Sequence, residues 1–96
     1  MKAFLNEFNN KANEFAADTS IKNFSKVKAC YDEFVKRFNE MSPTERSKVA
    51  MFNSGLSGMI NALAMHINNE AMFRALAPQM ATNISTTILD ILNALS

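Results

Sequence analysis

Two lysines and an arginine are the side chains of this sequence best suited to binding an anion. In the stretch SIKNFSKVKACYDEF, Lys22 and Lys26 stand four positions apart among aromatic residues, a spacing that places both on one face of a helix. Two ammonium groups can neutralise phosphates while an aromatic ring stacks on a base. A helical wheel, however, separates the aromatic residues of this stretch from the two lysines. The simpler interpretation is therefore that the rings form core and the lysines a solvated face. Anion binding would need another helix or a second copy to supply a ring, for which Phe8 is the candidate, with Arg74 as a further cation.

Catalytic chemistry has few candidate residues. The chain holds one cysteine, Cys30, and one histidine, His66. Lys26 lies four residues before Cys30 and could lower its pKa, although a small buried apolar residue is the commoner role. The histidine is interpreted as a hydrogen-bonded helix residue, with a pH-sensitive interface residue as the alternative. No phosphate-binding glycine loop, metal-ligand spacing or nucleophile elbow is present. We expect no enzymatic activity, no cofactor and no metal.

Composition and charge limit the classes of partner. The 96 residues are 48% hydrophobic and carry a formal charge of +1, which predicts one folded domain over residues 1–96 and no overall attraction to nucleic acid or anionic lipid. The basic residues do not gather on one recognition helix, so sequence-specific nucleic-acid binding is not expected. A lone cysteine fits a reducing compartment, and the start MKAFLNEFNNK lacks the apolar run of a secretion signal. We expect a cytoplasmic protein.

Charge is distributed unevenly along the chain. Nine of the ten basic residues lie within the first 48 positions, and from Val49 onward the only formal charges are Glu70, Arg74 and Asp90. The first half therefore has the pattern of a solvated helical protein. The second half is polar almost only through Asn, Ser and Thr.

Apolar spacing predicts helices throughout. Apolar residues recur at intervals of three and four over residues 3–16 and 20–41, as expected of amphipathic helices. The sequence Ser42-Pro43-Thr44-Glu45 has a cap, a first-turn proline and a glutamate able to reach back to the cap, so it predicts a new helix over about 43–67. In the last segment, Pro78 either kinks a long helix or begins a separate one. The fold class is therefore all-α: a small antiparallel bundle of three to five helices, with a helical hairpin (about 20–41 and 43–67) and a kinked or broken C-terminal helix.

The third helix has more apolar and small residues than one packing face needs. Around its wheel, one arc holds large apolar residues, and a second arc holds Met51, Gly55, Gly58, Met65 and His66, together with an alanine. Apolar or small residues thus cover about two-thirds of its circumference, a pattern typical of a helix that is central or shared with another chain. Each glycine costs about 1 kcal/mol against alanine inside a helix, which close approach of a neighbouring helix would explain. We expect these five residues to take part in self-association.

The leading hypothesis is a small non-enzymatic helical protein that forms a homo-oligomer and acts by binding. An inhibitor or adaptor of another protein, of the kind that phages and bacteria encode, fits this description. The first alternative is an oligomer that sequesters a small anionic ligand, such as a cyclic nucleotide, between chains. The second alternative is membrane insertion through the uncharged run 49–69, which is long enough to span a bilayer. The asparagines, serines, glycines and histidine of this run make insertion unfavourable.

Overall fold

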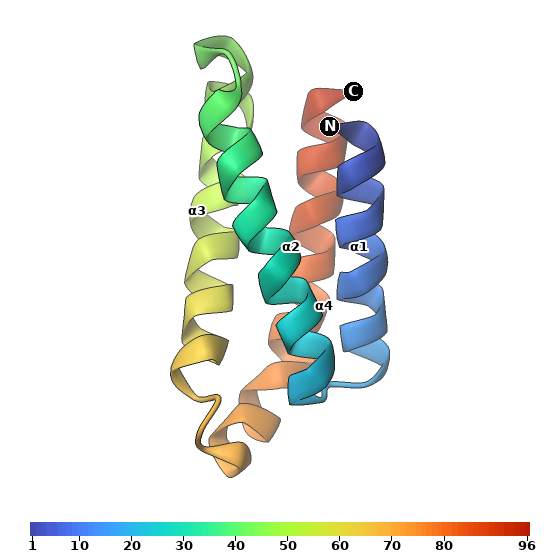
Figure 1. Cartoon of the computed structure of the whole chain (residues 1–96), viewed down its shortest axis with the longest axis vertical. Helices are drawn as coiled ribbons and strands as arrows, with labels where there is room; N and C mark the ends of the chain where they lie inside the picture. The colour runs from blue at the N-terminus through green and yellow to red at the C-terminus, as the bar shows by residue number, and fades with distance from the viewer.

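The computed structural model describes all 96 residues as a four-helix antiparallel bundle (Figure 1). It measures 41 × 21 × 18 Å along its principal axes. The helices run alternately down and up the long axis, and both termini lie at the same end. The all-α bundle predicted from the sequence is confirmed, with four helices: α1 Lys2–Ala17, α2 Ile21–Glu40, α3 Pro43–Met65 and α4 Glu70–Leu95.

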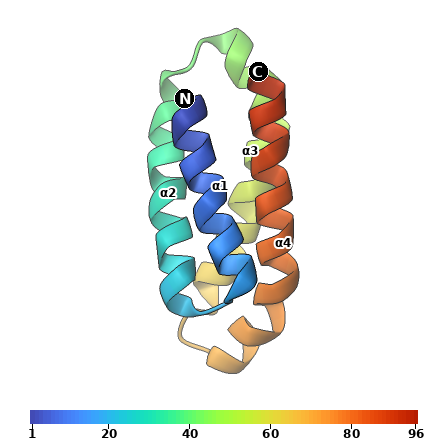
Figure 2. The ribbon, with the colours of Figure 1, turned by 90° about the vertical axis from the view of Figure 1, so that its right-hand side faces the viewer.

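Helix α4 is the element that holds the bundle together. It packs closely against both α1 and α3, and α2 packs mainly against α1. The predicted hairpin partners α2 and α3 follow each other with opposite directions, yet few of their residues are close and the two stand apart over most of their length (Figure 2). The apolar face of α2 therefore packs mainly on α1 and not along α3.

Side-chain caps begin three of the four helices. At α3, the Ser42 hydroxyl accepts a hydrogen bond from the backbone N–H of Glu45 at 3.2 Å. The carboxylate of Glu45 accepts from that hydroxyl at 3.4 Å instead of reaching back to the cap's N–H, so only half of the expected capping box is present. The other two caps satisfy N–H groups that have no partner inside a helix: they are Ser20, bonded to Asn23 N at 3.1 Å, and Asn69, bonded to Met72 N at 3.3 Å.

Aromatic rings from three helices meet inside the bundle. Phe15 of α1, Phe24 of α2 and Phe73 of α4 contact one another with ring centroids 5.6–6.2 Å apart. Centroid distances in this range are favourable for aromatic pairs. All 18 buried residues are apolar or aromatic, so the core contains no charged group that could do chemistry.

Close packing of α1 on α4 depends on small side chains. Ala12 of α1 and two alanines of α4, Ala77 and Ala81, are fully buried. Beside them, the Ser85 hydroxyl lies 2.6 Å from Asn13 Oδ1 and 3.2 Å from an amide oxygen of Asn9, which links the two helices through polar groups. The apolar periodicity placed Ala12 on the packing side of the first helix, but it did not identify the two alanines of α4 as core.

Helix α4 is continuous through Pro78 and changes direction near it (Figure 1). Proline lacks the N–H that would bond to the carbonyl four residues earlier, and its ring crowds that carbonyl. Of the two possibilities left open by the sequence, the kinked helix is the one observed. The expected third helix ends two residues early, at Met65, and Asn69 caps the next one. None of the four helices combines the length and the hydropathy that a bilayer crossing requires.

Candidate functional site

The outer face of α3 is the surface most unlike the rest of the molecule. The helix buries Val49, Leu56, Ile60 and Leu63 on its inner face. Directly opposite on the wheel, the side chains of Met51 and Met65 are 84% and 79% exposed, the highest values among the large apolar residues. Helix α3 is also the least amphipathic of the four helices. Apolar residues therefore lie on its outer face as well as on its inner face.

The exposed residues form a continuous strip. Met51, Gly58 and Met65 are seven positions apart, and seven residues make nearly two helical turns, so the three lie almost in line along the helix. We name this surface the α3 strip and define it by seven residues, all exposed except the half-buried alanine: Met51, Ser54, Gly55, Gly58, Asn61, Ala62 and Met65. No formal charge occurs between Lys48 and Glu70, so the strip is neutral along its length.

Nothing within the subunit accounts for the two glycines of the strip. Neither Gly55 nor Gly58 has a positive φ. A Cβ atom built on either one would meet no atom within 4 Å, outside the helix's own neighbouring backbone. The backbone conformation and the packing inside this chain therefore both tolerate alanine at these positions, and the destabilising effect of glycine in a helix interior has no internal compensation.

His66 lies at the end of the strip, as the C-cap of α3. Its backbone N–H donates to the carbonyl of Leu63 at 3.1 Å, which tightens the last turn. Its side chain is half-buried, beside the turn that leads to Asn69. The five residues expected to take part in self-association thus share one face or one end of α3, and none of the five is buried.

Three residues of the strip, Ser54, Asn61 and Ala62, are not among the five that were expected to take part in self-association. Ser54 and Asn61 are polar and exposed between the two methionines. Asn53 and Ser57 are half-buried, and Asn53 Oδ1 is buried without a hydrogen-bond partner. The wheel does give a signal for this amide, because Asn53 lies four residues after Val49 and three before Leu56, on the inner face of α3.

The four residues suggested for anion binding do not converge in one subunit. Phe8 is fully buried, with its ring 6.0 Å from that of Phe4 and 6.2 Å from that of Phe34. It has no exposed surface on which a base could stack. Lys22 and Lys26 are exposed on the outer face of α2 and form no ion pair.

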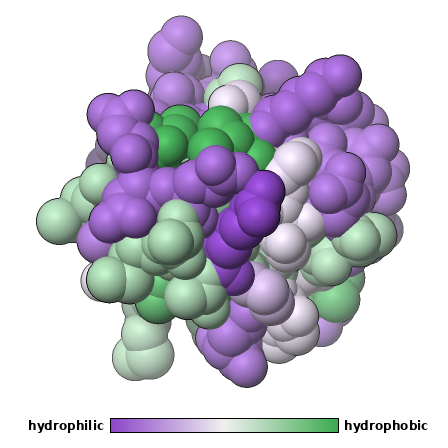
Figure 3. Space-filling model, turned by 90° about the horizontal axis from the view of Figure 1, so that it is seen from below, coloured by the Kyte–Doolittle hydropathy of each residue, from purple (hydrophilic) through white to green (hydrophobic).

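Arg74 lies at the opposite end of the bundle from the termini, beside the start of α2. Its guanidinium pairs with Glu70 at 2.6 Å, and both side chains remain largely exposed. It contributes to a shallow hollow of about 190 Å³, which is lined by Thr19, Ser20, Ile21, Glu70, Phe73 and Arg74. Figure 3 shows this end of the molecule, where apolar atoms reach the surface between hydrophilic ones. The hollow holds one carboxylate and one guanidinium, which largely cancel each other's charge.

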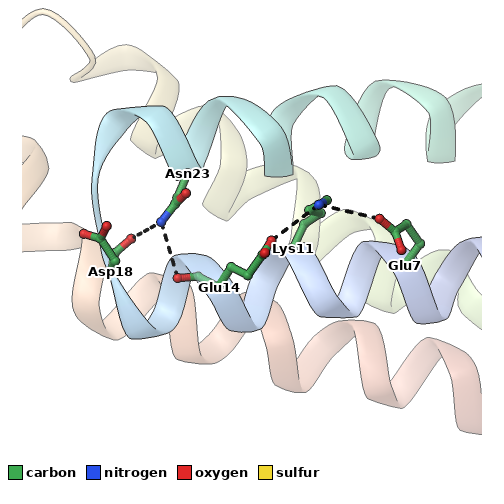
Figure 4. Close-up of polar contacts among 5 residues, drawn as sticks. All are labelled: Glu7, Lys11, Glu14, Asp18 and Asn23. Atoms are coloured by element: carbon green, nitrogen blue, oxygen red, sulfur yellow. Dashed lines mark hydrogen bonds and ion pairs between the residues drawn. The ribbon is translucent and has the colours of Figure 1, made fainter.

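Polar groups along α1 serve the fold. In Figure 4, Lys11 lies between Glu7 at 3.6 Å and Glu14 at 3.5 Å, and these carboxylates raise its pKa, with Glu14 contributing most. The Asn23 side chain donates to the backbone carbonyl of Asp18 at 2.9 Å, and so fastens α2 to the turn after α1. Each of these groups already has a partner within the subunit.

Cys30 has the environment of a structural residue. It is half-buried on α2, and burial raises the pKa of its thiol, with a smaller upward effect from Glu7. A reactive cysteine needs the opposite shift, toward the thiolate. The small apolar role favoured by the sequence is consistent with this environment.

The outer face of α4 satisfies its own polar groups. The hydroxyls of Thr82, Thr86 and Thr87 each donate to the carbonyl four residues earlier, at 3.3, 3.1 and 2.8 Å. Such bonds occupy the hydroxyl within the helix. The low charge of α4 therefore does not by itself require a partner, and the outer face of α3 remains the stronger candidate.

Comparison of the chain with protein-family models, with curated proteins and with solved structures finds no match. The structure also places no group of three or more His, Cys, Asp or Glu side chains where they could hold a metal ion.

Proposed function

We propose that this chain is a small non-enzymatic helical protein that self-associates through the outer face of α3 and acts by binding, as an inhibitor or adaptor of another protein. The observation that carries the proposal is the exposure of Met51 and Met65, 14 positions apart on a neutral strip. Flexible, polarizable methionine side chains make adaptable contact surfaces. Large apolar side chains grouped on one exposed face mark interaction sites more often than scattered ones do.

The charge pattern supports an apolar contact at this face. The outer faces of α1 and α2 carry the ion pairs Lys11–Glu7, Lys28–Asp32 and Arg37–Glu33. The α3 strip has none. A surface that presents methionine and glycine in place of lysine and glutamate loses little on desolvation, so it is suited to burial against another protein.

The test is the mass of the chain in solution. Sedimentation equilibrium at tens of micromolar should give more than the 10.7 kDa of one chain. Met51→Glu together with Met65→Glu should return the mass to one chain, because each carboxylate would have to be desolvated in the contact. The matched control, Ser25→Glu with Ala29→Glu on the exposed face of α2, should leave the mass unchanged. A single-chain mass for the unaltered protein would refute the proposal.

A second candidate function is sequestration of a small anionic ligand, such as a cyclic nucleotide, between chains. The observation that favours it is the pair of exposed, unpaired ammonium groups of Lys22 and Lys26, one turn apart on α2. Because Phe8 is buried, a stacking ring would have to come from another residue. Calorimetric titration with a panel of nucleotides tests this candidate, and Lys22→Glu with Lys26→Glu should abolish any heat of binding. No response across the panel would end it.

A further inference from the structure

We infer that the partner on the α3 strip is a second copy of the chain, packed antiparallel about a two-fold axis that passes beside Gly58, with the two α3 backbones in close approach at their glycines. This inference rests on the proposed self-association and specifies its geometry. Three features of the strip support this geometry: its glycines, the order of its residues and the charges at its ends.

The glycines indicate how close the partner comes. Gly55 and Gly58 have open space where a Cβ would lie, and no positive φ requires either one. Glycine in a helix interior is destabilising by about 1 kcal/mol relative to alanine. Removing the Cβ lets another backbone come nearer than the usual 8–10 Å between helix axes would allow. A second helix that crosses at these two positions would offset the destabilising effect of the glycines, which no contact within the subunit offsets.

The order of residues indicates that this helix is another α3. A two-fold interface brings the same surface of both copies together, so that residue i meets j and j meets i. The strip is nearly symmetric about Gly58, because Met51 lies seven residues before it and Met65 seven after it. In an antiparallel pair centred there, each Met51 meets the other copy's Met65 and each Ser54 meets the other copy's Ala62, while each Gly55 lies opposite the other copy's Asn61. The methionines then meet at the ends, and the two copies of Gly58 meet at the crossing.

The charges at the two ends favour the antiparallel direction. Lys48 is exposed without an ion pair near the start of α3. The last turn of α3 carries no basic residue. The antiparallel pair places Lys48 beside the other copy's α3 C-terminus, where the helix dipole is negative. A parallel pair would place the two copies of Lys48 side by side.

Cysteine cross-linking tests the geometry, with Cys30→Ala as the background in every variant. Gly58→Cys lies beside the axis, so oxidation should join two copies through one disulfide. Met51→Cys should not cross-link to itself, because the two copies of residue 51 would lie about 21 Å apart along the helix. A mixture of Met51→Cys and Met65→Cys chains should cross-link with a short bismaleimide. Ala29→Cys, exposed on α2, measures the background from random collisions.

Each outcome separates the geometry from the self-association itself. Cross-linking between two Met51→Cys chains, with no cross-link between a Met51→Cys chain and a Met65→Cys chain in the mixture, would show a parallel pair and overturn the inference. Cross-linking no greater than that of Ala29→Cys, with a solution mass above one chain, would also overturn it but leave self-association standing on another face. A single-chain mass for the Cys30→Ala background and for the unaltered protein would remove both.

Discussion

The thiol of Cys30 shows how a residue's environment, more than its type, decides its chemistry. Burial raises the pKa of this thiol above its ordinary value of 9.0, so less of it is thiolate near neutral pH. We expect iodoacetamide to alkylate Cys30 more slowly at pH 8 in the folded chain than in the chain unfolded in urea. The measurement is the alkylation rate by mass spectrometry, with a short peptide containing residues 28–32 as the control for the effect of urea. Equal rates in the two states would contradict the buried environment.

The same pKa shift predicts a dependence of stability on pH. The folded pKa of Cys30 is higher than the unfolded one, so between the two values the folded chain binds more protons than the unfolded chain. The free energy of unfolding therefore falls as the pH rises above about 9. Urea titrations at pH 8 and pH 10 should show a smaller loss of stability for Cys30→Ala than for the unaltered chain. An identical loss in both would show that other groups carry the whole effect.

At the scale of the elements, the cap of α3 should be energetically important. Ser42→Ala removes the acceptor for the N–H of Glu45, and loss of a serine cap typically costs about 1 kcal/mol. We expect a lower urea midpoint with an unchanged slope. Ser47→Ala, an exposed serine on the same helix whose hydroxyl only bonds back to the carbonyl of Thr44, should have a much smaller effect. If the two variants shift equally, the cap bond does not contribute.

The contact of α1 and α3 with α4 should tolerate no enlargement of its alanines. Ala81 is fully buried in α4, and extra methylene groups in a packed core cost about 1–3 kcal/mol. Ala81→Leu should therefore lower the free energy of unfolding by that amount. Ala75→Leu adds the same atoms to an exposed position of the same helix and should be nearly neutral. A neutral Ala81→Leu would mean that the helices separate easily.

The elements themselves could be predicted from the sequence, but their pairing could not. Apolar spacing and the serine caps depend on local physics, and they placed the first three helices to within about two residues. The start of the fourth helix, at Glu70, was not predicted. The separation of α2 from α3 depends instead on which faces can approach most closely. Buried alanines such as Ala77 and Ala81 of α4 allow close approach, and the apolar spacing does not distinguish them from exposed alanines of the same helix such as Ala75.

The candidate site was partly predictable for the same reason. Exposure of Met51, Gly55, Gly58 and Met65 follows from the wheel once the inner face of α3 is known, and the structure confirms it. The burial of Phe8 could also be foreseen, because it belongs to the apolar side of α1. Whether a ring from α1 could reach the lysines of α2 required the actual packing, in which Phe8 turns toward Phe34.

At the scale of the whole molecule, a chain of 96 residues with 18 buried ones has a modest core. Burying the α3 strip in a dimer would add apolar burial that the subunit does not achieve alone. Binding that involves only the folded state raises stability with concentration. The thermal midpoint of the unaltered protein should therefore rise between 1 and 100 μM, about the range usual for calorimetry and fluorescence.

Gly58→Gln should abolish this rise of the thermal midpoint with concentration, because the substitution stabilises the single subunit and destabilises the dimer. Within the subunit the new side chain meets open space, and replacing glycine by a good helix former should stabilise the fold by up to about 1 kcal/mol. At the crossing of two α3 helices the same side chain would force the backbones apart. At low concentration the thermal midpoint of Gly58→Gln should exceed that of the unaltered protein. It should not rise with concentration, so plots of the midpoint against concentration for the two proteins should converge or cross. Ala29→Gln on α2 should keep the concentration dependence. If Gly58→Gln also becomes more stable with concentration, in parallel with the unaltered protein, the α3 helices do not meet at this glycine.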